Sequence, residues 1–434
     1  MLVNRRRLDS IQGGALRSVL ILVENLPVPF DRRVWQEACA LRDAGYLVSV
    51  ICPTGPGYEG RFEVLDGVHI YRYRLPVEAA GAKGYAIEYG VALAKTFALC
   101  CRVWWTRGLD VIQACNPPDL LFLIGAFFKL FGKKFVFDHH DLSPELYEAK
   151  FGRRGFFHRV LRGLERWTFR TADVSIATNE SYRQIAIRRG RMRPERVFIV
   201  RSGPSLERLR PAPPDESLKC GRRFLVGYVG VMGRQEGIDD LLQAVRCIVH
   251  DMGRQDIHFG LVGGGTSLAE LRELAVQLGV DSHVTFTGRV PDDQMLAMLN
   301  TADVCVNPDK PGPMNDLSTM NKIMEYMALS KPIVQFDLKE GRFSAQHASL
   351  YARCGDAGDF ADKIVQLLDD PRRREAMGRF GRQRVLGQLQ WRHQIPQLLD
   401  AYAALWPAPV PVQHGAEEEP LPQDVPSLVE RRRA

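Results

Sequence analysis

The sequence lacks the features of a membrane-spanning or disulfide-stabilised protein. No run reaches the roughly 18 apolar residues that a membrane-spanning helix needs. The N-terminus contains Arg5, Arg6 and Arg7 but no apolar stretch of the kind that follows the basic residues of a secretory signal. The nine cysteines include no Cys-x-x-Cys pair, and the adjacent Cys100 and Cys101 cannot easily bridge. We therefore expect free thiols in a cytoplasmic protein.

Negative charge is scarce in the first half of the chain. Residues 1–200 contain 30 Lys and Arg against 20 Asp and Glu, whereas the remainder contains 28 against 31. A basic half suits an anionic partner such as a nucleotide, a lipid phosphate or a membrane surface, and a solvated basic surface explains it equally well. No recognisable nucleic-acid-binding module accompanies the charge, so we expect no nucleic-acid partner.

The pattern of apolar runs predicts two α/β domains. A chain of 434 residues is too long for one ordinary core. Short apolar runs that suit buried parallel strands alternate with helical stretches, first before and again after a proline-rich segment. The predicted strands lie near residues 18–23, 47–51, 68–71, 111–114, 134–137, 174–177 and 197–200, and then near 224–230, 258–263, 284–286, 304–306 and 333–336.

The same pattern predicts the domain boundaries. We expect an N-terminal tail at 1–16, a first domain at 17–203, a linker at 204–222, a second domain at 223–388, a closing helix at 389–408 and a disordered tail at 409–434. Both domains are predicted to be doubly wound, Rossmann-like parallel sheets, which bind ligands at the carboxyl ends of their strands. Two such domains facing each other would form a deep cleft.

Two glycine-rich turns precede predicted helices of the second domain. One contains Gly230 and Arg234, and the other contains Gly264 within Gly263–Gly265. Glycine lets a backbone approach a phosphate, and a helix N-terminus adds partial positive charge. Arg234 could neutralise a diphosphate. Tight structural turns and a surface arginine are the alternative interpretation.

The stretch Asn315–Ala328 is the most informative part of the second domain. Ser318 is expected to cap a helix whose first amides face the cleft. Lys322 and Glu325 fall on one helix face, where a lysine can meet a phosphate and a carboxylate can accept both hydroxyls of a ribose. The alternative is a solvated Lys322–Glu325 ion pair. Asn315, Asp316 and Asn321 are further candidates for binding the same ligand.

The order of several short phrases resembles the family 4 retaining glycosyltransferases, which have the GT-B fold. The resemblance runs from about Val19 to Tyr402. The matching phrases are Ala44–Val50, His140–Glu145, Gly263–Gly265, Val284–Val290, Ala302–Pro308 and Met324–Pro332. Each phrase is weak alone, and their common order and spacing carry the resemblance.

The resemblance implies roles for individual residues. Glu325 matches the second glutamate of the family's E-x7-E motif, which binds the ribose of the donor. Arg289 and Val290 match the loop that holds the nucleobase. His140 matches a histidine near the donor sugar and the reaction centre, where it can donate a proton to an oxygen; a structural histidine is the alternative, and His139 is the second candidate.

Three positions depart from the family pattern. The first glutamate of the motif would fall at Leu317, which cannot bind a sugar by a hydrogen bond, so Asp316, with Asn315, is expected to substitute. The family's phosphate-binding arginine and lysine would fall near Val231 and Glu236. We expect Arg234 and Lys322 to replace them.

No Asp-x-Asp triplet occurs in the chain. That triplet holds a divalent metal in the other large glycosyltransferase fold class, so its absence predicts a reaction without a metal. The only co-substrate expected is a nucleotide-diphosphate sugar, with no further cofactor. Resemblance implies retention of the anomeric configuration by front-face attack.

Two segments of the first domain bear on the acceptor and on a membrane. Residues 120–131 are strongly apolar and favour a buried helix. Residues 153–170 mix arginines with aromatic residues, which suits either an anionic membrane surface or a helix that buries its aromatic face. Resemblance implies a glycan or lipid-linked acceptor on this domain. Arg32 and Arg33, on the loop after the first predicted strand, are candidate contacts to an acceptor phosphate, and the basic amphipathic segment leads us to expect peripheral docking at the inner membrane face.

The sequence thus predicts a hexosyltransferase-like enzyme that acts in the synthesis of cell-surface polysaccharide or glycolipid. Two alternatives remain open. A nucleotide-sugar epimerase shares the GT-B fold and the nucleotide site but needs no acceptor. A degenerate protein that binds a nucleotide sugar without turnover would explain the departures at Leu317, Val231 and Glu236.

Overall fold

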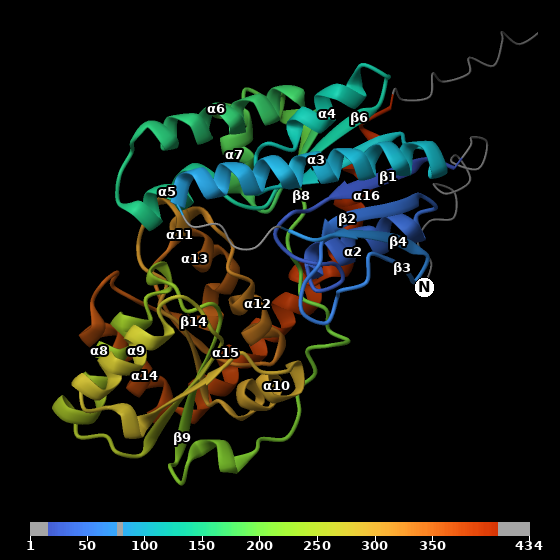
Figure 1. Ribbon diagram of the computed structural model, residues 1–434. Coiled ribbons are helices and arrows are strands. Elements are labelled where there is room, and N and C mark those ends of the chain that lie inside the picture. Colours follow the sequence, from blue (N-terminus) through green and yellow to red (C-terminus); the bar gives the residue numbers. More distant parts are fainter. Residues whose placement is uncertain (1–15, 76–80, 407–434) are drawn as a thin grey trace, which may run out of the picture.

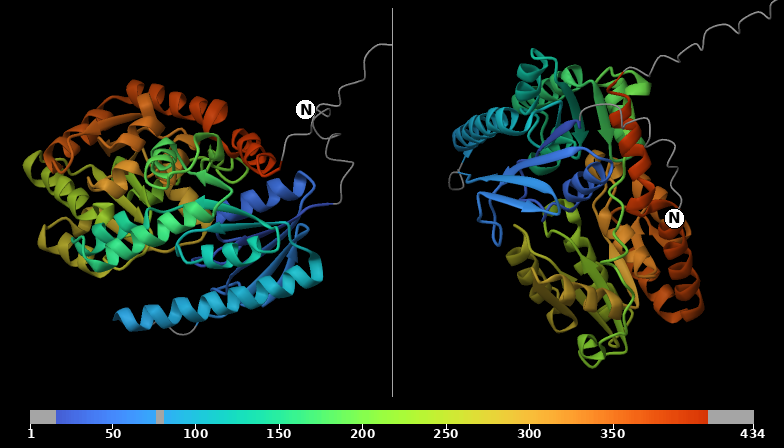
Figure 2. Two further views of the ribbon diagram at one scale, coloured as in Figure 1. Left: turned by 90° about the horizontal axis from the view of Figure 1, so that it is seen from above. Right: turned by 90° about the vertical axis from the view of Figure 1, so that its right-hand side faces the viewer.

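The computed structural model describes residues 16–75 and 81–406, and for residues 81–88 only the backbone (Figure 1). The tails predicted at 1–16 and 409–434 lie outside these ranges, apart from Leu16. The described chain forms two α/β halves, each built on its own sheet (Figures 1 and 2). All nine cysteines carry free thiols, as predicted.

The first half contains an eight-stranded sheet. Its strands are parallel except for an antiparallel edge strand, β3. β1 lies at the centre, where Val19 pairs with Val48 on one side and with Val111 on the other. In spatial order the strands are β3 (Phe62–Leu65), β4 (Val68–Tyr73), β2 (Leu47–Pro53), β1 (Ser18–Leu22), β5 (Val111–Cys115), β6 (Lys134–His139), β7 (Val174–Ala177) and β8 (Val197–Ile199).

The second half contains a six-stranded sheet that is parallel throughout. Every residue of β10 and β12 is buried, because helices cover both faces, and this explains the continuous apolar runs. In spatial order the strands are β11 (Val284–Gly288), β10 (Ile257–Val262), β9 (Phe224–Val229), β12 (Val304–Asn307), β13 (Ile333–Phe336) and β14 (Ser349–Ala352).

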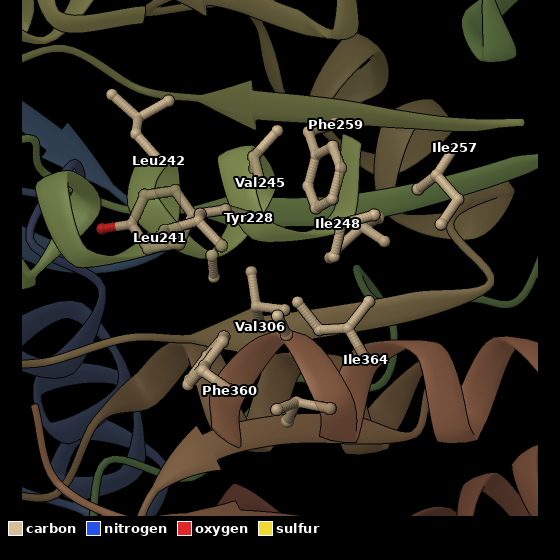
Figure 3. Packing of buried hydrophobic residues seen from close by; sticks show 14 of the residues in the cluster. Tyr228, Leu241, Leu242, Val245, Ile248, Ile257, Phe259, Val306, Phe360 and Ile364 are labelled. Atoms are coloured by element: carbon tan, nitrogen blue, oxygen red, sulfur yellow. The ribbon is translucent and has the colours of Figure 1, made fainter. Parts of the chain in front are cut away.

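Helices flank both sheets and close separate hydrophobic cores. Figure 3 shows part of the core of the second half, where Tyr228 and Phe259 of the sheet pack against Leu241 and Ile364 of the helices. The helices of the first half are α2 (Arg32–Asp43), α3 (Gly81–Arg107), α4 (Phe122–Lys129), α5 (Ser143–Phe151), α6 (Phe156–Thr171) and α7 (Glu180–Arg188). Those of the second half are α8 (Ile238–Arg246), α9 (Leu268–Gln277), α10 (Asp292–Thr301), α11 (Pro313–Leu317), α12 (Asn321–Ala328), α13 (Lys339–Ala345), α14 (Ala357–Asp369) and α15 (Pro371–Arg384).

The last described helix, α16 (Ile395–Ala403), returns to the first half. It contacts α2, β7 and β8 (Figure 1). Its Leu398, Ala401 and Tyr402 belong to the same buried cluster as Val19 and Val48. This helix therefore ties the two halves together.

Two strands and one cap differ from the sequence prediction. The edge strands β3 and β14 were missed; β3 is half exposed, so it shows none of the continuous burial that marks the central strands. Ser318 does not cap α12, because that helix begins at Asn321 with Met320 before it. Ser318 instead ends α11, and its hydroxyl lies 3.1 Å from the hydroxyl of Tyr182.

The two apolar segments of the first half are only partly buried. In α4 the side chains of Ile124 and Phe128 are buried, whereas Phe127 is 37% exposed, so the expected buried helix buries only one of its faces. In α6 only Phe169 of the aromatic residues is buried, while Phe156 and Trp167 are 67% and 55% exposed. The alternative that α6 buries its aromatic face is therefore wrong. None of the helices within 16–75 and 81–406 is both long and apolar enough to cross a membrane.

Candidate functional site

The two halves meet at the carboxyl ends of their strands. Asn179, directly before α7, donates from its amide to the carbonyl of Leu317 and to the hydroxyl of Thr319, both at 2.9 Å. Ser181 donates to Glu340 of α13 at 2.6 Å. The loop after β1 reaches across to the loop after β11, where the Arg289 guanidinium lies 4.9 Å from the ring centroid of Phe30. Ligand sites of open α/β sheets occur at such strand ends.

His140 follows β6 and lies at this junction. Its side chain is 15% exposed, and its Nε2 lies 2.7 Å from a carboxylate oxygen of the buried Asp138. The Arg33 Nε lies 2.9 Å from the same nitrogen. One ring nitrogen cannot both donate to Asp138 and accept from Arg33. Arg33 already has a partner, because it donates to Asp138 at 2.8 Å. We therefore assign the proton on the His140 Nε2 to the contact with Asp138.

Charge around His140 favours its protonated form. Burial alone would lower the pKa of His140, but Asp138 outweighs it, so the pKa lies above its ordinary value. Although burial acts to raise the pKa of Asp138, Arg33 and His140 hold it well below the usual range. Asp138 therefore favours the protonated form of His140 and fixes the orientation of its ring.

His139, the second candidate, belongs to the core. It is fully buried among Phe137, Phe169 and Tyr182. Burial lowers its pKa to about 3, so its ring is neutral. It is therefore out of reach of a ligand at the junction.

Arg33 is held in the interior rather than at the surface. Its guanidinium lies 2.8 Å from Asp138 and 3.0 Å from Glu37, and it donates to the carbonyl of Val200. The expected contact between Arg33 and an acceptor phosphate does not fit this placement, because its donors already have partners. Arg33 positions the carboxylate that holds His140.

Cys115, Asp138 and His140 bring together three atoms of the kinds that bind metals. These atoms lie within 4.8 Å of one another. The Arg33 guanidinium already binds Asp138, which opposes a second cation there. Burial raises the pKa of Cys115 well above its ordinary value, so the thiol keeps its proton and is a poor metal ligand.

Lys322 on α12 does not pair with Glu325. Its ammonium lies 2.8 Å from Glu236 and 2.9 Å from the buried Asp309. The alternative of a solvated Lys322–Glu325 pair is therefore wrong. Glu236 occupies the position of the family's lysine, and it pairs with Lys322 of α12. The charge of Lys322 is therefore neutralised by two carboxylates.

Glu325 faces arginines from the linker and from the first half. Its carboxylate lies 3.0 Å from the guanidinium of Arg208 and 3.4 Å from that of Arg32. Both arginines also contact Asp292, the first residue of α10. The side chain of Glu325 is 18% exposed, so it borders the junction and is not part of the core.

The two glycine-rich turns lie against each other. The Gly230 amide donates to the carbonyl of Val262, and a Cβ atom at Gly263 would lie 1.9 Å from the carbonyl oxygen of Gly230. Gly263 also has a φ of 133°, in the region that favours glycine. Nothing lies within 4 Å of a Cβ atom built on Gly264, so the backbone there borders open space that a phosphate can approach.

The remaining candidates occupy different positions around these turns. Arg234 is 84% exposed and lies 3.7 Å from Glu270. Arg289 is exposed, and Val290 is half-buried against the core around α12. Asn321 is exposed at the start of α12.

Asn315 and Asp316 have structural partners. The buried amide of Asn315 donates to the carbonyls of Gln235 and Lys310, at 2.8 and 2.9 Å. Asp316 accepts from the backbone amide of Lys339 at 2.9 Å, at the start of α13. Leu317 packs against the core of the first half, which explains an apolar residue at this position.

Sequence reasoning missed Arg208 and Asp292. Arg208 lies in the proline-rich linker, where no motif marks it, and Asp292 resembles any acidic residue in the first turn of a helix. A guanidinium next to two carboxylates becomes visible only when the linker is folded onto α10 and α12. Burial opposes the charge on Arg208, but hydrogen bonding to Asp292 and the charge of Glu325 raise its pKa.

Two α/β domains whose sheets, parallel apart from the edge strand β3, meet at their strand ends define the GT-B class. The last described helix, packed on the first half, belongs to the same pattern. Solved structures agree. Sucrose-phosphate synthase from Thermosynechococcus elongatus superposes with a TM-score of 0.73 at 19% identity, over 90% of this chain and 99% of that chain. The complex of Anabaena HepE with UDP-glucose superposes with a TM-score of 0.66 at 16% identity, over 89% and 99%.

Family models match both halves. The "Glycosyl transferase 4-like domain" matches residues 31–203, and "Glycosyl transferases group 1" matches residues 223–370. The chain therefore belongs to the group 1 glycosyltransferases of GT-B fold, as the sequence motifs predicted.

Curated relatives share part of their length with this chain. A GDP-mannose-dependent alpha-(1-6)-phosphatidylinositol monomannoside mannosyltransferase of Mycobacterium tuberculosis is 30% identical over 46% of this chain and 53% of that protein. The alpha-maltose-1-phosphate synthase of Mycolicibacterium smegmatis is 26% identical over 63% and 73%. The match with the mannosyltransferase spans about half of that relative's length.

Proposed function

We propose that this protein transfers a sugar from a nucleotide-diphosphate sugar to an acceptor. One observation carries the proposal. Arg32 and Arg33 are neighbours in the first turn of α2; Arg33 contacts His140, and Arg32 contacts Glu325. A histidine of the first half and a carboxylate of the second half, far apart in sequence, thus border one site where the strand ends meet.

The second half would hold the nucleotide. Glu325 is suited to accept the ribose hydroxyls once Arg32 and Arg208 give way. The backbone at Gly264 is open enough to approach the diphosphate, whereas Gly230 packs against the side chain of Tyr228. Arg289 and Val290 would border the base. The HepE complex with UDP-glucose and the GDP-mannose-dependent mannosyltransferase support a nucleotide sugar as co-substrate.

The first half would supply the proton donor. During transfer, the bond between the anomeric carbon and the leaving phosphate oxygen breaks, and a bond to the acceptor oxygen forms. His140 can donate a hydrogen bond to the sugar or the leaving oxygen, and the departing phosphate can take the acceptor proton. This front-face course retains the anomeric configuration and needs no metal or further cofactor, because amides and cations stabilise the leaving diphosphate.

A binding protein without turnover is the second candidate, since Lys322 is already neutralised by Glu236 and Asp309. The epimerase has no comparable observation in its favour. Catalysis requires that a diphosphate compete with these carboxylates or that Arg234, Arg208 and backbone amides meet its charge instead.

We further propose a lipid-linked acceptor and peripheral docking on an anionic membrane at the cytoplasmic face. α3, α4 and α6 lie together on one side of the first half (Figure 1). Large apolar side chains are exposed there, including Trp105 of α3 at 91%, Leu130 directly after α4 at 81% and Phe156 of α6 at 67%. Arginines flank the exposed aromatic side chains of α6, which is the composition of a helix that lies on an anionic bilayer.

A substrate screen tests the proposed reaction. The full chain is incubated with each of a set of nucleotide-diphosphate sugars, with and without membrane extract, and released nucleotide diphosphate and new glycosidic bonds are measured. Transfer that requires extract supports a glycosyltransferase with a lipid acceptor. An epimer formed from donor alone would establish the epimerase, and tight nucleotide binding with no turnover would establish the binding protein.

A further inference from the structure

An arginine-lined hollow lies on the first half, away from the junction. It consists of two adjoining pockets of about 600 and 540 Å³, formed by α6, the end of α7 with the segment that follows it, and Leu405 beyond α16. Arg166 and Arg191 line both pockets, so the two form one continuous hollow. None of the candidate donor or catalytic residues lines it.

The charge in this hollow is almost wholly positive. Among the described residues, no ion pair forms at the lining arginines 162, 166, 188, 191 and 193. The carboxylate of Asp173 also lines the hollow, but it lies 2.9 Å from Lys129 and accepts from the amide of Phe135. Like charges within the roughly 8 Å over which physiological salt screens them repel one another, so an anion would relieve the repulsion.

Arg191 also has an unfavourable backbone conformation. Its φ is 58°, in the left-handed region where glycine is favoured and a long side chain costs energy. The preceding residue, Gly190, has no room for a side chain, since a Cβ atom there would lie 2.5 Å from the ring of Phe169. An arginine at a position suited to glycine points to a role for its guanidinium.

We propose that this hollow binds a phosphate-bearing group with at least two negative charges. A guanidinium group can bind two phosphate oxygens at once, and the five lining arginines named above have no ion pair among the described residues, whereas Arg189, which also lines the hollow, lies between Glu145 and Glu165. The exposed Phe156 and Trp167 lie on the same helix as Arg166, so a lipid phosphate and a soluble phosphate ester can both reach it. In the lipid case the site rests on the membrane docking proposed above; in the soluble case it stands without it.

Two probes distinguish these sources. Inorganic pyrophosphate is titrated into the full chain by calorimetry, and vesicles of phosphatidylcholine with or without phosphatidic acid are used in flotation. Arg166→Gln and Arg191→Gly should each weaken binding by about tenfold, or about 1.4 kcal/mol. Arg372→Gln, which removes an exposed charge from α15 of the other half, should bind like the wild type.

The outcomes separate the sources and the failures. Binding of vesicles alone assigns a lipid phosphate, and binding of both probes assigns a phosphate group from either source. Wild-type binding of both probes by the two variants, or no binding of either probe by the wild-type chain, overturns the proposal. Misfolding does not confuse the result, because glycine suits the φ of residue 191, so the melting temperature of Arg191→Gly should not fall.

The test is independent of the proposed transferase activity. Pyrophosphate that enters the donor site would be insensitive to Arg166→Gln and Arg191→Gly. Conversely, a chain that binds no nucleotide diphosphate would refute the donor site while leaving the dependence on these two arginines intact.

Discussion

In each half of the molecule, near the strand ends, a largely buried cation lies between two acidic side chains. In the first half, Arg33 lies between Asp138 and Glu37, at 2.8 and 3.0 Å. In the second half, Lys322 lies between Glu236 and Asp309, at 2.8 and 2.9 Å. Both clusters lie near the strand ends, where the two halves meet.

The clusters differ in where they lead. The first continues from Asp138 to His140, which is partly exposed, and through Gln113 to Tyr402 of α16. In the second cluster, Lys322 forms ion pairs only with Glu236 and Asp309 among the described residues. Glu325, on the same helix, contacts Arg208 and Arg32 instead. The first cluster therefore orients His140, the proposed proton donor, whereas the second mainly stabilises the fold around the glycine-rich turns. The following variants test this division.

Loss of the histidine should have the largest effect. His140→Ala removes the proposed proton donor and should lower kcat by about 100- to 10,000-fold. Nucleotide affinity should stay near the wild-type value, since the donor would be held by the second half. His347→Ala, an exposed histidine of the second half, serves as control. Wild-type turnover in His140→Ala would remove His140 from the reaction.

Loss of the buried lysine should act on stability. Lys322→Met leaves Glu236 and Asp309 facing each other without a cation, which should lower the free energy of unfolding by about 3–5 kcal/mol. Chemical unfolding of the full chain measures this loss.

A second variant tests the cause. Lys322→Met combined with Glu236→Gln leaves only Asp309, and burial raises the pKa of this carboxyl, so that it can take a proton and stay neutral. The double variant should therefore recover part of the lost stability in mildly acidic buffer. Equal losses in both variants would show that the lysine acts through packing.

Much of the fold could be predicted because its signals are local. Buried parallel strands appear as short apolar runs, and Asp31 directly before Arg32 accepts from the amide of Val34 as a helix cap. The two glycine-rich turns were recognised because the close approach of Gly230 and Gly263 excludes any larger side chain. The family motifs likewise lie on contiguous segments.

The partners of the site residues could not be predicted, because they come from distant segments. Nothing local reveals that Lys322 meets Glu236, 86 positions away, or that Arg208 meets Glu325, 117 positions away. Arg32 and Arg33 read alike in the sequence, yet a helix sends successive side chains to different faces, so one lies at the junction and the other is buried.

Loss of Glu325 should have a moderate effect. Glu325→Ala removes both the proposed hydrogen bonds to the ribose and the contacts with Arg32 and Arg208, and it should weaken nucleotide binding by about 10- to 100-fold, as expected for the loss of charged hydrogen bonds. Asp292→Ala removes only contacts with Arg32 and Arg208, so it should leave affinity unchanged or raise it. Calorimetry with nucleotide diphosphates measures both, and equal losses would assign Glu325 to closure alone.

The smallest effect concerns the pH dependence of the first cluster. Burial raises the pKa of Glu37 to about 8 from an ordinary value of 4.5. Between these values the folded protein binds more protons than the unfolded chain, so its stability decreases as the pH rises from about 5 to 8. Glu37→Gln removes this contribution, so its melting temperature should fall less over that range than that of the wild type. The exposed Glu195→Gln should keep the wild-type slope, and an unchanged slope in Glu37→Gln would mean that Glu37 is ionised beside Arg33.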